Sequence, residues 1–297
     1  MRDLADYFLT VYAKERRLSK KYVYECTGLL THVILPRWGN LKVKAITHDD
    51  IRRLKIDMEL KPVRANRCLA LLSKMFNLAI EKKIRPDNPV KGIERNPEAK
   101  RDDFMSLGEL ERLMRVLANQ EDHLQANGIR LLVLTGARIG ELLSAEWAHF
   151  DLEGGIWTKP PSNTKQRRVH RAPLSSPALE ILRRMKFESI SSPFLFPSPS
   201  NSMKPRESFR KFWLKVRMEA ALGDVVLYTA RHTYASHLLV SGVPLGVIGA
   251  LLGHSQPSTT ARYAHVGDIA GKAATEKMGD ILENIRALIA APTDGLI

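Results

Sequence analysis

Hydrophobic positions repeat at helical spacing through the first third of the chain. The first such face consists of Leu4, Phe8, Val11 and Tyr12. A second periodic run extends from Tyr22 to Ile34, and Pro36 and Gly39 are expected to stop it. Two amphipathic helices are therefore predicted before residue 40.

Helix-start signals mark two more helices in the same third. Thr47 precedes Asp50 by three residues, a capping-box pattern, and the next helix begins after Pro62. One side of this fourth helix is apolar, with Leu69, Leu72, Phe76 and Ile80. The opposite side carries Arg64, Arg67 and Lys74. The pattern predicts a helical bundle with a basic outer face.

A change in pattern separates this bundle from the rest of the chain. Residues 84–103 are rich in proline and charge and lack periodicity, as expected of a linker. Ser106 and Glu109 then form a second capping box ahead of an apolar-periodic helix. We predict a helical domain over residues 1–99 and a second domain over 100–297.

The second domain is predicted to be mainly helical with a small antiparallel sheet. Helical patterning continues to about Trp147, and two short β-prone runs follow at Gly155–Thr158 and Arg168–Arg171. Helices are expected again from Pro177, after which 191–202 reads as an irregular connection, and a long last helix ends near Ala291. The fold class is therefore α+β, dominated by helices.

The charge of the chain indicates a polyanionic partner. The formal net charge is +14, and residues 1–100 hold 22 Lys and Arg against 12 Asp and Glu. Nucleic acid is the commonest partner of such a surface, although a basic face that only keeps the protein soluble is the simpler alternative. Cys26 and Cys68 are too few for a disulfide framework and read as reduced core residues. No signal peptide or membrane-spanning run is apparent, so a cytoplasmic protein is expected.

Candidate chemistry begins at Arg138, three residues before Glu141. Residues three apart on a helix share a face, so Glu141 can hold the guanidinium or the local backbone. A guanidinium suits a phosphodiester because it donates to two oxygens at once and stays charged. An ordinary surface ion pair is the alternative for this motif taken alone.

Further candidates cluster near the end of the chain. Arg231 and His232 lie in LYTARHTYASHLL, His254 follows a helix that begins at Pro244 and closes at Gly253, and Tyr263 stands nine residues later. In this order these motifs, with TGARIGELL around Arg138, resemble the tyrosine recombinase (phage integrase) family.

That resemblance implies roles for named residues. Arg138, Arg231 and His254 would contact the scissile phosphate, Tyr263 would be the nucleophile, and Lys165 in NTKQRRVHRAPLS would protonate the leaving oxygen. Lys159, at the end of the first β-prone run, is the rival lysine. The sequence departs from the family signature at Tyr228, where histidine is common; a phenol can donate a hydrogen bond to phosphate but is a poor base near neutrality. His232 and His237 are expected to be packing residues.

The resemblance also implies a fold, a reaction and partners. Residues 1–99 would be a core-binding, SAM-like DNA-binding domain, with Arg64, Arg67 and Lys74 on DNA, and residues 100–297 a catalytic domain with a C-terminal oligomerisation helix. Arg167 and Arg168 would also contact DNA. The reaction would join duplex DNA to Tyr263 through a 3′-phosphotyrosyl bond, with no metal, ATP or cofactor. The implied assembly is a homotetramer on paired sites, weakly associated or monomeric without DNA, with possible DNA-bending accessory proteins. Because Met1 lies directly at the first helix, an upstream arm-binding domain is expected to be absent or removed.

Two other functions fit the same residues. A type IB topoisomerase would share the Arg, Lys, His and Tyr chemistry but relax supercoils without exchanging partners. A non-catalytic DNA-binding relative would keep the fold, and Tyr228 favours it slightly. A histidine-based metallonuclease is disfavoured because no H-x-x-H motif or carboxylate cluster is present.

Overall fold

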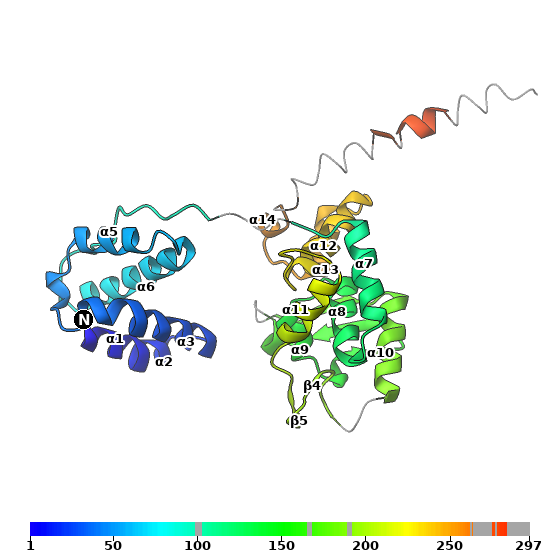
Figure 1. Ribbon diagram of the computed structural model, residues 1–297, viewed down its shortest axis with the longest axis horizontal. Helices are drawn as coiled ribbons and strands as arrows, with labels where there is room; N and C mark the ends of the chain where they lie inside the picture. The colour runs from blue at the N-terminus through cyan, green and yellow to red at the C-terminus, as the bar shows by residue number, and fades with distance from the viewer. Residues whose placement is uncertain are drawn as a thin grey trace, which may run out of the picture. The chain divides into compact units, whose positions relative to one another are not determined.

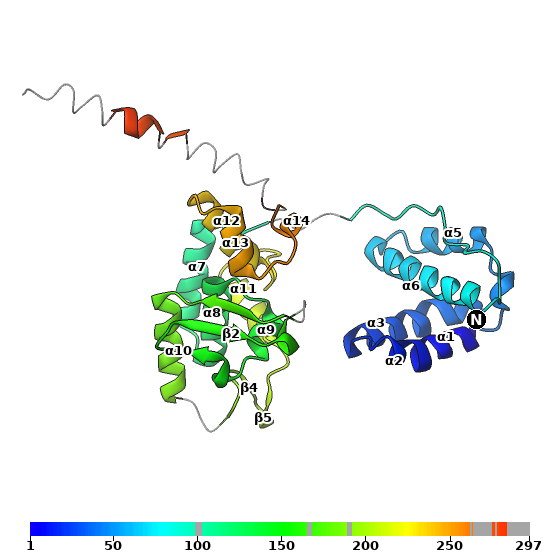
Figure 2. The same ribbon diagram turned by 180° about the vertical axis from the view of Figure 1, so that it is seen from behind.

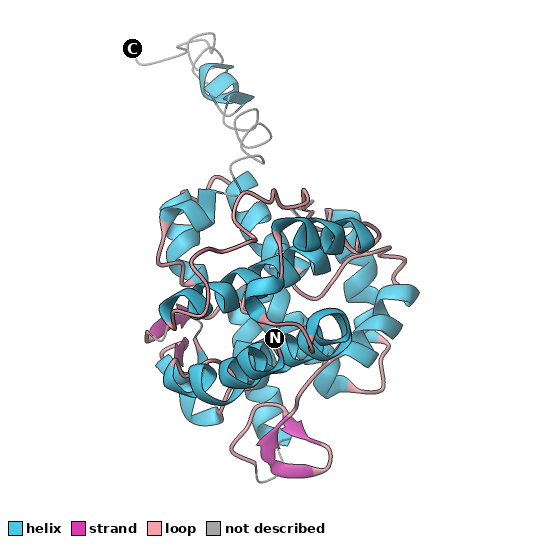
Figure 3. Cartoon of the chain, turned by 90° about the vertical axis from the view of Figure 1, so that its left-hand side faces the viewer, coloured by secondary structure: helices cyan, strands magenta, loops and turns pink. Residues whose placement is uncertain are grey.

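The computed structural model consists of two compact units, Met1–Lys100 and Arg101–Ile297. It describes residues 1–98, 103–164, 168–188, 192–261, 263, 275–276 and 278–283. Figure 3 shows that helices make up most of these residues, with strands in small separate patches. The division falls one residue from the domain boundary expected from the sequence.

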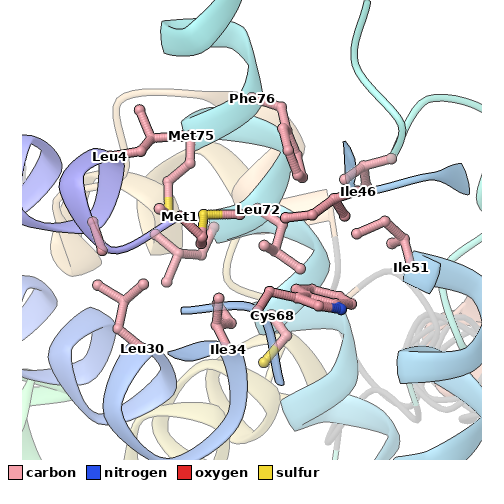
Figure 4. Packing of buried hydrophobic residues seen from close by; sticks show 14 of the residues in the cluster. Met1, Leu4, Leu30, Ile34, Ile46, Ile51, Cys68, Leu72, Met75 and Phe76 are labelled. Atoms are coloured by element: carbon pink, nitrogen blue, oxygen red, sulfur yellow. The ribbon is translucent and has the colours of Figure 1, made fainter. Parts of the chain in front are cut away.

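The regular elements of the first unit are all helical in its described residues. Its elements are α1 (Arg2–Tyr7), η1 (Phe8–Tyr12), α2 (Ala13–Glu15), α3 (Lys20–Leu29), η2 (Leu30–Ile34), α4 (Leu35–Trp38), η3 (Val43–Ala45), α5 (His48–Asp57) and α6 (Pro62–Glu81) (Figure 1). The capping box of Thr47 and Asp50 opens α5, and Pro62 occupies the first turn of α6, as predicted. The core forms around α6, whose Leu72, Met75 and Phe76 are completely buried (Figure 4).

The second helical run does not stop at Pro36. It continues from α3 through the π-helical turn η2 into α4 and ends only at Gly39. A π-helical turn shifts backbone hydrogen bonds away from the regular helical ladder, so Pro36, which has no N–H to donate, falls where that ladder is already changing. The expectation that Pro36 ends the helix was therefore wrong.

The basic face of α6 is present on this unit. Arg64 and Arg67 are exposed, whereas Lys74 is half-buried, with its Nζ 4.9 Å from the centre of the Tyr12 ring. Cys26 and Cys68 are both buried and unpaired by disulfides, in agreement with their reading as core residues.

The second unit surrounds α8 with other helices (Figure 2). Its helical elements are α7 (Leu107–Ala118), α8 (His123–Thr135), α9 (Ile139–Leu143), η4 (Trp147–His149), η5 (Pro161–Asn163), α10 (Ser176–Glu188), α11 (Arg210–Glu219), α12 (Thr229–Val240), α13 (Leu245–Leu252) and α14 (Pro257–Thr260). The predicted capping box of Ser106 and Glu109 opens α7. Helices α7, α10 and α12 all pack against α8.

Two small antiparallel sheets lie in the described part of this unit. The first has the order β1 (Phe150–Asp151), β2 (Ile156–Lys159), β3 (His170–Pro173), and the second pairs β4 (Pro197–Ser198) with β5 (Asn201–Pro205). The predicted hairpin is confirmed as β2 and β3, although β3 begins two residues later than expected. Strand β1 and the second sheet were not predicted, because runs of two residues, or runs flanked by proline, show no alternation.

The predicted long C-terminal helix lies largely outside the described residues. Residues 275–276 and 278–283 are helical, and Met278 and Ile281 are exposed. No helix in the described part of the chain is both long and apolar enough to cross a membrane.

Candidate active site

Arg138 is positioned where α8 turns into α9. Gly136 ends α8 in the left-handed conformation, with φ of 59°, which a residue without a side chain adopts freely. Arg138 is the residue before α9, and its Nη1 lies 2.5 Å from Oε1 of Glu141. The other carboxylate oxygen accepts a 3.3 Å hydrogen bond from the Arg138 main-chain N–H. Glu141 thus holds both the guanidinium and the backbone of Arg138.

Lys159 binds the same carboxylate from the end of β2. Its Nζ lies 3.0 Å from Oε2 of Glu141 and 4.3 Å from the centre of the Trp157 ring. Only 1% of Lys159 is exposed. Burial opposes ionisation of Glu141, but Lys159 and Arg138 outweigh it, so the pKa of Glu141 is lowered. Lys159 is therefore enclosed in an ion-pair cluster instead of facing solvent.

Arg231 lies on the first turn of α12 and is almost completely buried. Its Nη1 donates to the carbonyl oxygen of Gly136 at 2.8 Å, and its Nη2 donates to the carbonyl oxygen of Leu252 at 2.7 Å. These carbonyls stand at the C-terminal ends of α8 and α13, where the helix dipole favours a cation. Burial lowers the pKa of Arg231, and Arg138 lowers it further, yet a guanidinium remains charged in proteins.

His254 follows Gly253, which ends α13 in the left-handed conformation. Its Nε2 lies 2.9 Å from Nη2 of Arg231, and its Nδ1 lies 2.8 Å from Oγ1 of Thr260. Because a guanidinium can only donate, Nε2 accepts in this contact and the ring proton resides on Nδ1. Thr260 thus orients the imidazole against Arg231.

Arg138 and His254 face one cavity. The cavity has a volume of about 160 Å³ and is lined by Arg138, Glu141, Thr164, Arg168, Val169, His170, Gly253, His254 and Ser255. The structure thereby brings together the three predicted phosphate ligands, because Arg231 contacts His254 directly. A larger cavity of about 550 Å³ beside α10 has a mainly apolar lining and contains none of the predicted catalytic residues.

Tyr263 lies in the same part of the unit but is enclosed. It is 2% exposed and packs with Ile248 and Leu252 of α13. Its ring meets the ring of His232 at 5.5 Å, and His232 in turn meets Tyr228 at 5.0 Å, both nearly edge-to-face. His232 thus packs between two phenols, as expected for a packing residue, and Tyr228 is 43% exposed.

Two of the predicted site residues lie outside the described residues: Lys165 and Arg167. Arg168 is exposed at the rim of the cavity that holds Arg138 and His254. His237 packs edge-on against Phe104, and its Nε2 lies 2.8 Å from the carbonyl oxygen of Met105, again as a packing residue.

Sequence reasoning missed two residues that build the site. His170 on β3 contacts the carbonyl oxygen of Ala250 through Nε2 at 2.9 Å, and its ring lies against Gly253. Lys159 was weighed only as a rival general acid, and its ion pair with Glu141 was not foreseen. A signal for it existed, since Lys159 alternates in phase with Trp157 along β2 and so faces the same side of the sheet.

Among the described residues, no group of three or more His, Cys, Asp and Glu side chains gathers in a way that could hold a metal ion.

Comparison with known proteins places the chain in a family. Residues 103–268 match the model of the phage integrase family. A tyrosine recombinase of Pseudothermotoga lettingae is 29% identical over 269 residues, which cover 83% of this chain and 92% of the relative. A tyrosine recombinase of Thermosipho africanus is 30% identical over 213 residues, covering 68% of this chain and 71% of the relative.

Solved structures show the same fold. A variant of the Tn1549 transposon integrase in complex with transposon right end DNA matches with a TM-score of 0.75 and 15% identity, covering 93% of this chain and 99% of that one. A lambda integrase dimer bound to a COC′ core site matches with a TM-score of 0.74 and 19% identity, covering 89% of this chain and 94% of that one. The family model spans more than half of this chain, and the chain aligns with most of the length of both tyrosine recombinases. This chain therefore belongs to the phage integrase family and is a tyrosine recombinase.

Proposed function

We propose that this chain cleaves and rejoins duplex DNA through a covalent 3′-phosphotyrosyl bond to Tyr263. One contact supports this site above all others: Nη2 of Arg231 lies 2.9 Å from Nε2 of His254. His254 and Arg138 line the same cavity. With the buried Arg231 in contact with His254, cationic and hydrogen-bonding groups from three separate helical segments converge here. Such a cluster would stabilise charge on the nonbridging oxygens of a phosphodiester, as a divalent cation does in other enzymes.

In the proposed reaction the phenol of Tyr263 gives up its proton to solvent, its oxygen attacks phosphorus, and the bond from phosphorus to the 5′ oxygen breaks. Lys165 gives a proton to that oxygen, which leaves as a 5′-hydroxyl. The phosphotyrosyl bond keeps the energy of the original phosphodiester, so a 5′-hydroxyl from another strand reverses the step without ATP. Tyr228 donates a hydrogen bond to the phosphate from its exposed position at the start of α12.

Tyr263 must become accessible before this attack. Its side chain is 2% exposed and packed against α13, so its hydroxyl reaches a DNA phosphate only when the packing between Tyr263 and α13 changes.

The DNA duplex would be held by basic faces on both units. Arg64, Arg67 and Lys74 occupy one helix of the first unit, and Arg167 and Arg168 precede β3 of the second in the sequence. The excess of ten positive charges within residues 1–100 supports this assignment, because phosphate contacts supply most of the affinity for DNA.

We further propose that the active assembly is a homotetramer on paired sites, held by the helix after Tyr263. The lambda integrase that matches this fold has been described both as a dimer on a core site and as a tetramer on a Holliday junction. The exposed apolar residues Met278, Ile281 and Leu282 of the described C-terminal segment support a role in association.

A selection for covalent capture tests the proposal and identifies the DNA site in the same experiment. The full chain is incubated with EDTA and a pool of nicked duplexes that carry a randomised centre, and DNA that remains bound after denaturation is sequenced. We expect the wild-type chain to recover a defined sequence and to release a strand whose 5′-hydroxyl accepts phosphate from polynucleotide kinase directly.

Tyr263→Phe is the matched control. It removes only the hydroxyl and keeps the buried ring, so DNA binding should persist while covalent capture disappears. Capture by the Phe variant would assign the nucleophile to another residue, and relaxation of plasmids that lack the selected sequence would favour a topoisomerase.

A further inference from the structure

Lys159 is a buried charge that no step of the proposed reaction uses. A lysine is almost never fully buried unless it is paired, because removing an ammonium from water is costly. Here the partner is Glu141, at 3.0 Å, and the same carboxylate also receives Arg138. Removing Lys159 would leave a two-charge pair in which Glu141 cancels Arg138.

We infer that Lys159 sets the net charge of the phosphate site: it takes up the negative charge of Glu141, so that the positive charge of Arg138 remains for the substrate. Lys159 acts through Glu141 and is therefore a positioning residue. The inference rests on the proposed function only in so far as the ligand of the site is a phosphate.

The charges of the cluster make the role quantitative. Arg138, Lys159 and Arg231 are cationic and Glu141 is anionic, which gives a net charge of +2 in a largely buried region. Without Lys159 the net charge falls to +1. Lys159 is electrostatically coupled to both arginines, since each of them contributes to the lowering of its pKa after burial, which is the largest cause.

Geometry allows this effect to be separated from a packing role. Lys159 is enclosed by Trp157 on one side and by Glu141 on the other. Replacement by glutamine keeps an N–H donor near Glu141 on a slightly shorter side chain and removes the charge. The sheet contributes the position itself, because Lys159 pairs across the hairpin with His170, which lines the cavity.

The test titrates inorganic phosphate into the full chain at constant ionic strength and follows the histidine ring signals by NMR. The His254 signal is identified through its loss in His254→Gln. Four proteins are compared: wild type, Lys159→Gln, Glu141→Gln and the double variant Lys159→Gln/Glu141→Gln. Lys186→Gln is the matched control, because Lys186 also stacks on a tryptophan, with its Nζ 4.9 Å from the Trp147 ring, but is exposed and away from the cavity.

The expected order of phosphate affinity follows net charge. Lys159→Gln should weaken binding at the His254 signal by about tenfold, which is the scale of one unit charge roughly 10 Å from the ligand at an effective dielectric constant of about 20. The double variant should return to within about threefold of wild type, Glu141→Gln should bind no more weakly than wild type, and Lys186→Gln should be unchanged. Single-turnover cleavage of the selected DNA should fall in Lys159→Gln and recover in the double variant.

A purely structural lysine would give a different pattern. In that case Lys159→Gln would lower the melting temperature but leave the phosphate affinity unchanged, and this result overturns the inference. A phosphate affinity that falls in Lys159→Gln but stays low in the double variant overturns it as well. If affinities follow the expected order but the wild-type chain never captures DNA, the proposed function fails and the role of Lys159 stands. If the wild-type chain captures DNA and the affinities do not follow charge, the inference alone fails.

Discussion

Arg231→Lys tests whether the second arginine is held as the structure indicates. Arg231 donates to the carbonyl oxygens of Gly136 and Leu252 at 2.8 and 2.7 Å, from two different nitrogens of its fork. A lysine keeps the charge but has a single nitrogen on a flexible stem, so it can satisfy only one of these two diverging contacts.

The expected cost follows from the lost contact. A hydrogen bond from a charged donor contributes about 1.5 to 3 kcal/mol, and the deserted carbonyl is left in a buried region. We therefore expect Arg231→Lys to lose about 2 to 3 kcal/mol of unfolding free energy. For a unit of nearly 200 residues this corresponds to roughly 4 to 12 °C in melting temperature.

Urea unfolding followed by tryptophan fluorescence measures this loss, because Trp147, Trp157 and Trp213 all lie in the second unit. Arg183→Lys is the control: Arg183 also donates to one main-chain carbonyl, that of Leu152 at 2.8 Å, but on the surface. It should change stability by less than about 0.5 kcal/mol. Equal stabilities of the two variants would refute the view that Arg231 ties the ends of α8 and α13 together.

Three further outcomes are expected. Lys165→Ala should be rescued by a 5′-bridging phosphorothiolate, whose thiolate leaves without a proton, whereas Arg231→Ala should not; equal defects on both substrates would remove Lys165 from the acid role. Tyr228→Phe should keep its contact with His232 and its melting temperature but cleave several-fold more slowly, and an unchanged rate would limit Tyr228 to packing. Burial is the largest cause of the lowered pKa of His170, with Lys159 adding to it, so the unfolded chain binds this proton more readily. The stability that neutral His170 contributes is present above its usual pKa of about 6.5 and is lost as the pH falls below that value. His170→Gln should therefore show a smaller fall in the urea midpoint between pH 7 and pH 5 than the wild type. Equal falls in the two proteins would contradict a buried, neutral His170.

The parts of the fold that were predicted correctly are those whose cause is local. A capping box needs only Ser106 and Glu109, and the C-terminal end of α13 needs only Gly253, which adopts φ of 66° without strain. In both cases the residues that end or begin the helix are within one turn of the position they determine.

The features that the sequence did not predict depend on contacts between residues far apart in the chain or on weak sequence patterns. Proline usually ends a helix, so Pro36 is expected to do so. No residue near it in the sequence indicates the π-helical turn that accommodates it. The same holds at the site, where Arg231 finds its carbonyl partners 95 and 21 residues away and Lys159 finds Glu141 18 residues away. The family resemblance implied that Arg231 and His254 share one phosphate, but only tertiary packing determines which groups surround them.

The two arginines of the site are held in physically different ways, and this difference bears on the proposed reaction. Arg231 is fixed by neutral carbonyl groups at two helix ends, which orient the guanidinium without cancelling its charge. Arg138 is fixed by a carboxylate, which orients it more strongly but would neutralise it if Lys159 were not bound to the opposite oxygen. A phosphoryl-transfer transition state gains negative charge on its nonbridging oxygens, so the site needs positioned cations that remain cationic. Rigid placement and undiminished charge conflict whenever the positioning group is itself an anion, and the buried lysine on β2 resolves that conflict for Arg138.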